Sequence, residues 1–317
     1  MVPTLESAAP PITATRWFNR FAWGVLAWNI LVVLWGAYVR ASGSGAGCGN
    51  HWPLCNGDVV PRAPRLETII EFTHRMMSGV ALIAVIGLAV WSFYRFPRGH
   101  RVRRAANLSV LFLIVEALLG AGLVLFQYVD RNASVGRAFY LSLHLVNTQL
   151  LLAALALTAW YSRGRPTPLG RARPLIVATL PIAIVISVAG VVAALGDTLY
   201  PSASLAEGMR QDLSTAASFL IRLRMLHPAF AILGAIYFVV VAFKMARFTP
   251  LAAYTIILSA AQLLLGAMNL ALLAPIWIQI THLLVADLLW LALVLLTVET
   301  RESTTTNQQL TTSGSCP

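Results

Sequence analysis

The sequence predicts an all-α integral membrane protein, with eight transmembrane helices arranged as two pseudo-symmetric four-helix bundles. The first reason is composition, since 58% of the 317 residues are hydrophobic and only 11% are charged. A soluble globular protein carries about 25% charged residues. The second reason is a set of eight long apolar runs, and the third is a repeat that relates the two halves of the chain.

Each apolar run is long enough to cross a bilayer, for which an α-helix needs about 20 residues. The first run follows a polar, proline-containing segment, and the later runs are separated by loops rich in charged or turn-forming residues. Transmembrane helices are therefore expected, in chain order, at residues 21–40, 69–93, 105–127, 139–161, 174–195, 219–243, 251–273 and 276–298.

Basic residues gather in the loops on one side of these runs. Arginines fill the loops after the second and fourth runs, and further basic residues follow the sixth run and precede the first. The loops on the other side hold acids beside their bases, from Asp58 and Glu67 to Asp212. The positive-inside rule then predicts a multi-pass protein of the cell (inner) membrane with both termini in the cytoplasm. Topology and anionic membrane lipid account for the net charge of +11, and no nucleic acid partner is expected.

Polar segments flank the membrane region. Residues 1–16 form a cytoplasmic N-terminal segment without the pattern of a cleavable signal, so the first run serves as the insertion signal. Residues 299–317 are rich in Thr, Ser and Gln and predict a disordered cytoplasmic tail, in which Cys316 has no assigned role.

The two halves of the chain repeat one another. VEALLGAGLVL (115–125) resembles AQLLLGAMNLALL (261–273), which places Glu116 opposite Gln262. LHLVNTQLLLAALAL (143–157) resembles THLLVADLLWLALVL (281–295), and a weaker match places Gly36 opposite Gly190. Because each half has four spans, the halves share one orientation in the membrane. We expect an N-terminal bundle at residues 17–165 and a C-terminal bundle at 166–298.

Four histidines occupy matching places near one end of four apolar runs: His74, His144, His227 and His282. Imidazole is costly in hydrocarbon unless something holds it, and it is a good axial ligand for haem iron. Two histidines at equal depth on facing helices of a bundle can hold a porphyrin between them. The pattern predicts one bis-histidine haem site in each half, near the outer face of the membrane.

Alternative roles for the histidines stay open. Each could cap or hydrogen-bond within a helix end, although four that are related by a repeat make this a weaker interpretation than it is for one. A zinc or copper site fits poorly, because the second half offers two histidines without a nearby thiolate or carboxylate. The remaining histidines, His51 and His100, lie in loops and are expected to be solvated.

Further polar residues lie near the same helix ends. Arg40, Arg75, Arg222 and Arg224 are placed either to contact haem propionates or to extend towards lipid headgroups. Glu71 lies three residues before His74 and shares its helix face, where a carboxylate could take up protons or stabilise a cationic intermediate. Its alternative role is to complement the helix dipole.

Cys48 and Cys55 lie in a glycine-rich loop, RASGSGAGCGNHWPLCNGD, after the first run. The flanking glycines and proline allow the backbone to bring the thiols together. The outer side of a bacterial membrane is oxidising, so a disulfide is the favoured state. It is either a structural clip over the pocket or a redox-active pair that relays electrons.

Together these residues resemble the haem A synthase family, in its bacterial, cysteine-containing type. The resemblance rests on GAYVRASGSGAGC, WPLC, EFTHRMMSG, SLHLVNTQ and the two C-terminal histidine helices, and it covers about residues 17–298. It implies a haem-dependent oxidoreductase of cytochrome oxidase assembly. Such an enzyme oxidises the C8 methyl group of haem O to a formyl group by successive hydroxylations.

The resemblance also implies ligands for two haems. His74 and His144 would hold the iron of the substrate, haem O, in the N-terminal bundle. His227 and His282 would hold a haem b cofactor in the C-terminal bundle, which relays electrons.

The remaining implications concern Glu71, the cysteines and the partners. Glu71 would be the essential acid beside the first histidine, and Cys48 with Cys55 would be the external cysteine pair. The expected partners are haem O, a haem O-supplying farnesyltransferase and cytochrome oxidase assembly factors, and an oligomer is possible.

Two other functions compete with this one. A diheme membrane b-type cytochrome, acting as a quinol or thiol electron-transfer protein, shares the histidines but needs neither Glu71 nor the cysteine loop. A transporter working between the halves would favour broken helices, to which Pro228 and Pro275 point.

Overall fold

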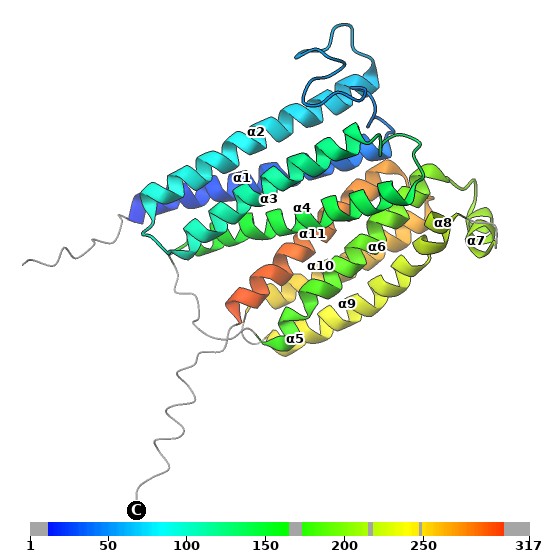
Figure 1. Cartoon of the computed structure of the whole chain (residues 1–317). Helices are drawn as coiled ribbons and strands as arrows, with labels where there is room; N and C mark the ends of the chain where they lie inside the picture. Colours follow the sequence, from blue (N-terminus) through cyan, green and yellow to red (C-terminus); the bar gives the residue numbers. More distant parts are fainter. Residues whose placement is uncertain (1–11, 165–172, 215–217, 247–248, 301–317) are drawn as a thin grey trace, which may run out of the picture.

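The computed structural model describes residues 12–164, 173–214, 218–246 and 249–300. All regular elements in these ranges are helices (Figure 1). They are α1 (Ile12–Ala41), α2 (Leu66–Arg95), α3 (Arg101–Leu125), α4 (Val135–Tyr161), α5 (Pro174–Val177), α6 (Thr179–Leu199), α7 (Leu205–Leu213), α8 (Phe219–Arg224), α9 (Leu226–Met245), α10 (Leu251–Ala271) and α11 (Ile276–Glu299). The predicted N-terminal segment and C-terminal tail lie mostly outside the described residues.

The prediction of an all-α protein that crosses the membrane several times is confirmed. The described chain contains 8 helical segments that are long and apolar enough to span a bilayer, one for each predicted run. Several of the helices extend beyond the run that predicted them. For example, α2 covers Leu66–Arg95, because charged residues such as Glu67 and Arg95 end the apolar run but do not end the helix.

The fifth and sixth spans are each broken by a proline. Helix α5 ends at Val177 and α8 ends at Arg224, and each of these residues lies four positions before a proline, Pro181 and Pro228 respectively. Proline has no N–H to donate to the carbonyl four residues earlier, and its ring crowds that carbonyl. Both breaks therefore follow directly from the sequence.

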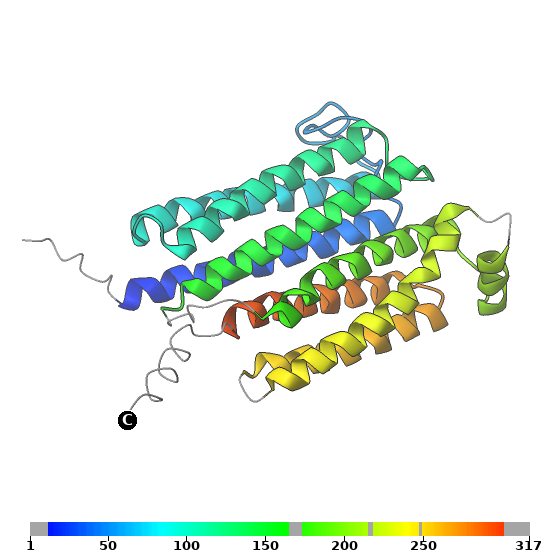
Figure 2. The ribbon, with the colours of Figure 1, turned by 60° about the horizontal axis from the view of Figure 1, so that its bottom comes forward.

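Two four-helix rings make up the molecule, one from each half of the chain. Helices α1 to α4 pack around one ring, and α6, α9, α10 and α11 pack around the other. Figure 2 shows the two groups side by side with their helices running in similar directions. Contacts of α4 with α6 and α11, and of α1 with α11, join the rings.

The two ends of the bundle differ. The loop between α1 and α2 lies at the same end as α7, whereas α5 lies at the opposite end (Figure 1). We call the first of these the histidine end, because His74, His144, His227 and His282 all lie in the part of their helices nearest to it.

His100, at the other end, is not simply solvated as predicted. It is the N-cap of α3, where its Nδ1 accepts a hydrogen bond from the N–H of Val102 at 3.2 Å. Its ring stacks on Phe96 with the centroids 4.8 Å apart. Burial, with the charge of Arg101, lowers the pKa of His100, so the ring stays neutral near pH 7 and keeps the lone pair that the cap needs.

Candidate functional site

Three of the four histidines pack against a glycine of a neighbouring helix. A Cβ on Gly36 of α1 would lie 2.9 Å from Cε1 of His74, and a Cβ on Gly190 of α6 would lie 2.9 Å from Cε1 of His227. The contact at Gly266 is looser, with Cε1 of His282 at 3.3 Å. At the fourth equivalent position, Gly120, nothing comes within 4 Å. The repeat that the sequence predicts is therefore visible in how the rings are seated.

The C-terminal pair has the separation that two imidazoles need to share one iron. The ring centroids of His227 and His282 are 6.4 Å apart, and the rings are nearly perpendicular at 88°. Imidazole binds a metal through a bond of about 2.0–2.1 Å. With about 1 Å from each nitrogen to its own ring centre, two such bonds in line separate the centroids by about 6–6.5 Å.

The two rings of this pair are held at different nitrogens, Nδ1 in His227 and Nε2 in His282. Nδ1 of His227 lies 3.2 Å from the carbonyl oxygen of Ile186, and a carbonyl only accepts, so Nδ1 carries the hydrogen. A hydrogen bond at Nδ1 leaves Nε2 free to bind a metal and fixes the tautomer of the ligand. In His282 the side-chain amide of Gln262 lies 3.1 Å from Nε2 itself, so this amide has to turn away before that nitrogen can bind iron. The spacing of the pair fits a bis-histidine haem on that condition.

In the N-terminal pair a carboxylate faces the imidazole of His144, and it does so at Nδ1, whereas Gln262 faces Nε2 of His282. Nδ1 of His144 lies 3.1 Å from Oε1 of Glu116 on α3. Glu116 is held in turn by Nδ2 of Asn147 at 2.6 Å and by the hydroxyl of Thr148. Glu116 thus directs the Nε2 lone pair of His144 away from itself, as a carboxylate behind a metal ligand does.

Glu116 and Gln262 were missed as functional residues, although the sequence contained the signal. The repeat aligns them, and the structure places each beside the histidine of the following helix, His144 or His282. What the repeat did not reveal is that these side chains face the imidazoles.

Glu71 and Arg75 tie the cysteine loop to α2. Glu71 is buried, at 4% exposure, and its Oε2 accepts a hydrogen bond from the N–H of Cys48 at 2.8 Å. Its Oε1 pairs with Arg75 at 2.5 Å. Arg75 also donates to the carbonyl oxygens of His51 at 2.8 Å and Leu54 at 2.6 Å.

The loop itself is closed by the predicted disulfide between Cys48 and Cys55. Gly47 packs so tightly against the backbone of α2 that a Cβ there would collide with Glu67, and its carbonyl accepts from the hydroxyl of Thr68 at 2.8 Å. The structure thus gives the loop a fixed place over the histidine end, beside Glu71. It does not test the predicted catalytic role of Glu71.

The four arginines that were predicted to contact propionates all have protein partners. Arg40 donates to the carbonyl of Ala194 at 2.9 Å and to Gln279 at 3.0 Å. Arg224 pairs with Asp212 at 2.5 Å and Asp197 at 3.3 Å. Arg75 is bound as described above, and Arg222 also has a partner. Their contact with propionates stays a prediction.

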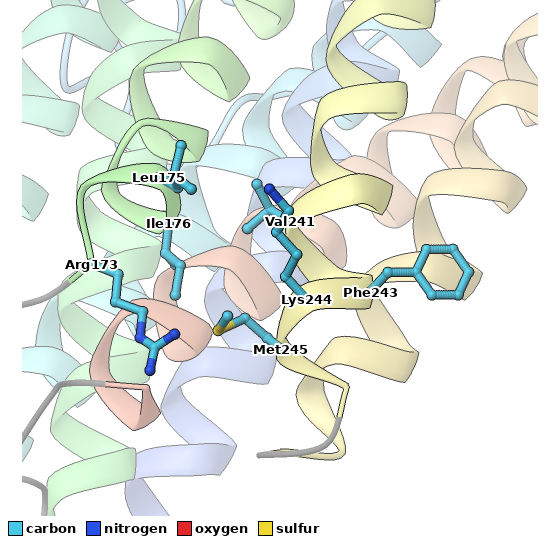
Figure 3. Close-up of a pocket in the computed structure, with 7 residues that line it drawn as sticks. All are labelled: Arg173, Leu175, Ile176, Val241, Phe243, Lys244 and Met245. Atoms are coloured by element: carbon cyan, nitrogen blue, oxygen red, sulfur yellow. The ribbon is translucent and has the colours of Figure 1, made fainter.

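Other features of the described residues do not form a site with the histidines. No group of three or more His, Cys, Asp or Glu side chains in the described ranges could hold a metal ion. A cavity of about 460 Å³ lies between the start of α5 and the end of α9, away from the histidine end (Figure 3). Its walls are mostly apolar, and Arg173 and Lys244 are at its lining.

The fold and the histidines define a class: a multi-pass membrane protein of two four-helix rings, each with two histidines near the same end. A profile of the family described as cytochrome oxidase assembly protein matches residues 19–294. Heme A synthases of Halalkalibacterium halodurans and Shouchella clausii are 40% and 46% identical over 139 and 101 residues. These matches cover 44% and 32% of this chain, and 45% and 34% of those proteins. The chain belongs to the haem A synthase family of cytochrome oxidase assembly proteins.

One relative is longer than this chain. A protein of Thermus thermophilus named protoheme IX farnesyltransferase is 47% identical over 292 residues, which cover 89% of this chain. The same match covers 48% of the Thermus protein, so the chain spans about half the length of that relative.

Proposed function

We propose that the chain is a haem A synthase that oxidises the C8 methyl group of haem O to a formyl group by successive hydroxylations. The N-terminal bundle holds haem O between His74 and His144. The C-terminal bundle holds haem b between His227 and His282. The observation that carries the proposal is the 6.4 Å separation of the C-terminal imidazoles, which matches two axial ligands of one iron.

The chemistry explains why two sites are useful in one chain. If water supplies the oxygen, conversion of a methyl group and one water to a formyl group releases four electrons and four protons. When bound, haem b supplies a one-electron carrier close to the substrate. The residues of the chain then have to hold the substrate, accept protons and keep the two bundles in a fixed position relative to each other.

The contacts of the two sites support different tasks for the two bundles. Glu116 places a carboxylate at Nδ1 of His144, which makes the imidazole a more basic ligand at Nε2, whereas the amide of Gln262 lies at Nε2 of His282. Glu71 is confined to the N-terminal bundle and lies one helical turn before His74. We assign Glu71 the acid–base role at the substrate, with Arg75 and the disulfide loop holding it in place.

The wider context of the proposal is the haem O pathway. The name of the Thermus relative supports a haem O-supplying farnesyltransferase as a partner, alongside oxidase assembly factors. The basic loops support the bacterial inner membrane as the location, with cytoplasmic termini. Arg173 and Lys244, at the cavity in Figure 3, are placed for anionic lipid headgroups.

The test is extraction and mass analysis of haems from cells with and without the chain, and from the purified protein. Haem A that appears only in cells with the chain supports the synthase. Haem b alone in the purified protein, without any change in cellular haem A, would instead support the diheme b-type cytochrome.

A further inference from the structure

Asp287, in the middle of α11, is an acid without a partner. It is 3% exposed, and its Oδ2 has no hydrogen-bond partner among the described residues. No ion pair among the described residues includes Asp287. An unpaired carboxylate at such a depth in a membrane protein costs several kcal/mol, so its presence needs a physical reason.

Gln149 is the counterpart of Asp287 in the other half of the chain. Each lies five residues after a histidine, His144 or His282, in the two segments that the repeat aligns. Gln149 is 4% exposed. Its Nε2 donates to the hydroxyl of Ser187 at 2.7 Å, but its Oε1 has no partner among the described residues.

Both side chains belong to the junction between the bundles. The indole N–H of Trp290 on α11 donates to the carbonyl oxygen of Gln149 on α4 at 2.8 Å. Asp287 precedes Trp290 by three residues, which puts both on the same face of α11. Ser187, the partner of Gln149, lies on α6. Helices α4, α6 and α11 therefore meet where Gln149 and Asp287 lie.

A proton on Asp287 supplies the kind of donor that this junction lacks. Oε1 of Gln149 can only accept a hydrogen bond, and so can an ionised Asp287. A protonated carboxyl has an O–H to donate and carries no charge to desolvate, and Gln149 leaves an acceptor oxygen without a partner at the same junction of the described helices.

The helices that pack against α11, and α11 itself, carry the other titratable groups that can face Asp287. They are Arg16, Arg20, Tyr38 and Arg40 on α1, Arg137, Tyr140, His144 and Tyr161 on α4, Asp197 on α6, Tyr254 on α10, and His282 and Glu299 on α11 itself, with none on α5. Among the described residues none of them forms an ion pair with Asp287, and His282 on the same helix belongs to the C-terminal site, so a change of charge at that site acts on the proton of Asp287 along α11.

We propose that Asp287 and Gln149 form a buried proton-binding site between the two bundles, which gains a proton when the His227–His282 site is reduced and loses it on oxidation. The proposal rests on haem binding at that histidine pair. Asp287 lies about 7.5 Å further along α11 than His282, within reach of a charge in a low-dielectric interior. Reduction adds one electron from the reductant, and one proton from water then enters the carboxylate.

The experiment is a redox titration of the purified, haem-loaded protein at a series of pH values. In the unmodified protein the midpoint potential of the C-terminal haem falls as pH rises, because the ionised Asp287 stabilises the oxidised site. In Asp287→Asn the potential becomes independent of pH and is higher than that of the unmodified protein at high pH, while the two agree at low pH. Asp58→Asn, the same change in the outer loop, keeps the pH dependence.

Infrared difference spectra of the reduced and oxidised protein provide a second readout. A protonated-carboxyl band should appear on reduction, shift with ¹³C-labelled aspartate and disappear in Asp287→Asn. A pH-independent potential in the unmodified protein, an unchanged slope in Asp287→Asn, or a band that survives the substitution each overturns the proposal. Haem content, measured on the same samples, separates this failure from a failure of haem binding itself.

Discussion

At the residue scale, a glycine on a neighbouring helix determines where each of two histidine rings lies. A Cβ on Gly36 would lie 2.9 Å from Cε1 of His74, and a Cβ on Gly190 would lie 2.9 Å from Cε1 of His227. That distance is well inside van der Waals contact for carbon, so any larger residue must push the ring away. The seat of each imidazole is therefore specified by a residue on a different helix.

Substitution of Gly36 by Ala should weaken haem binding in the N-terminal bundle. The new methyl group displaces His74, and loss of ligand orientation typically costs 10–100-fold in metal affinity. The measurement is haem content per protein, by Soret absorbance and extraction. Gly120→Ala is the matched control, because nothing lies within 4 Å of its Cβ position. Equal haem content in the two variants would contradict the ring-seating role.

Glu71→Gln separates the two roles of Glu71. Glutamine keeps an oxygen that can accept from the N–H of Cys48 or from Arg75, so the loop should stay in place and haem should stay bound. It cannot take up a proton at neutral pH, so haem A formation should fall by about 10²–10⁴-fold if Glu71 is the acid–base group. Haem A production is measured beside protease sensitivity of the loop. Near-normal production with a protected loop would leave Glu71 only its structural role.

At the scale of elements, hydropathy predicted all eight spans but not where the helices end. Helix α7 was missed because it is short and polar, yet Ser204 and Glu207 carry the spacing of a capping box, and the N–H of Glu207 does donate to the Ser204 hydroxyl. The break at Arg224 agrees with Pro228, to which the sequence had pointed, and the break at Val177 was equally readable from Pro181. In each case the sequence contains the capping residues or the proline that set the helix end, but a hydropathy pattern does not take such residues into account.

The sequence predicts which residues belong to the candidate site, but not which of their side chains face one another. The positions of the histidines and the cysteine pair follow from spacing along the chain. The contact between Glu116 and His144, and that between Glu71 and the N–H of Cys48, depend on how helices and loop face one another. Side-chain direction of that kind is set by tertiary packing, which a single sequence does not display.

We predict that the whole loop loses its fixed position when its disulfide is removed. Replacing both Cys48 and Cys55 by Ser removes a cross-link of a type that contributes about 2–4 kcal/mol, so the N–H of Cys48 should no longer stay on Glu71. We expect faster proteolytic cleavage within residues 42–65, located by mass spectrometry, with haem in the C-terminal bundle unaffected. Cys316→Ser is the matched control for a changed thiol. A loop as resistant as that of the unmodified protein would show that Arg75 and Thr68 hold it unaided.

At the scale of the whole molecule, Arg40 is a charged residue that joins the two bundles. It lies four residues after Gly36, which seats His74, and its guanidinium reaches Ala194 and Thr198 on α6 and Gln279 on α11. Gln279 precedes His282 by one helical turn. One side chain thus connects the histidine seat of one bundle to the histidine helix of the other.

Arg40→Ala should loosen this connection without emptying either site. Hydrogen bonds to a charged group contribute about 1.5–3 kcal/mol, so the unfolding free energy should fall by about that much, whereas Arg20→Ala, at the exposed other end of α1, should change it by less than about 0.5 kcal/mol. Because the position of one site relative to the other is then no longer fixed, electron exchange between them should slow. Each haem should keep its own spectrum. Thermal unfolding and flash-induced electron transfer measure the two effects. A variant that melts earlier but exchanges electrons at the original rate would show that Arg40 stabilises the junction without setting the geometry between the sites.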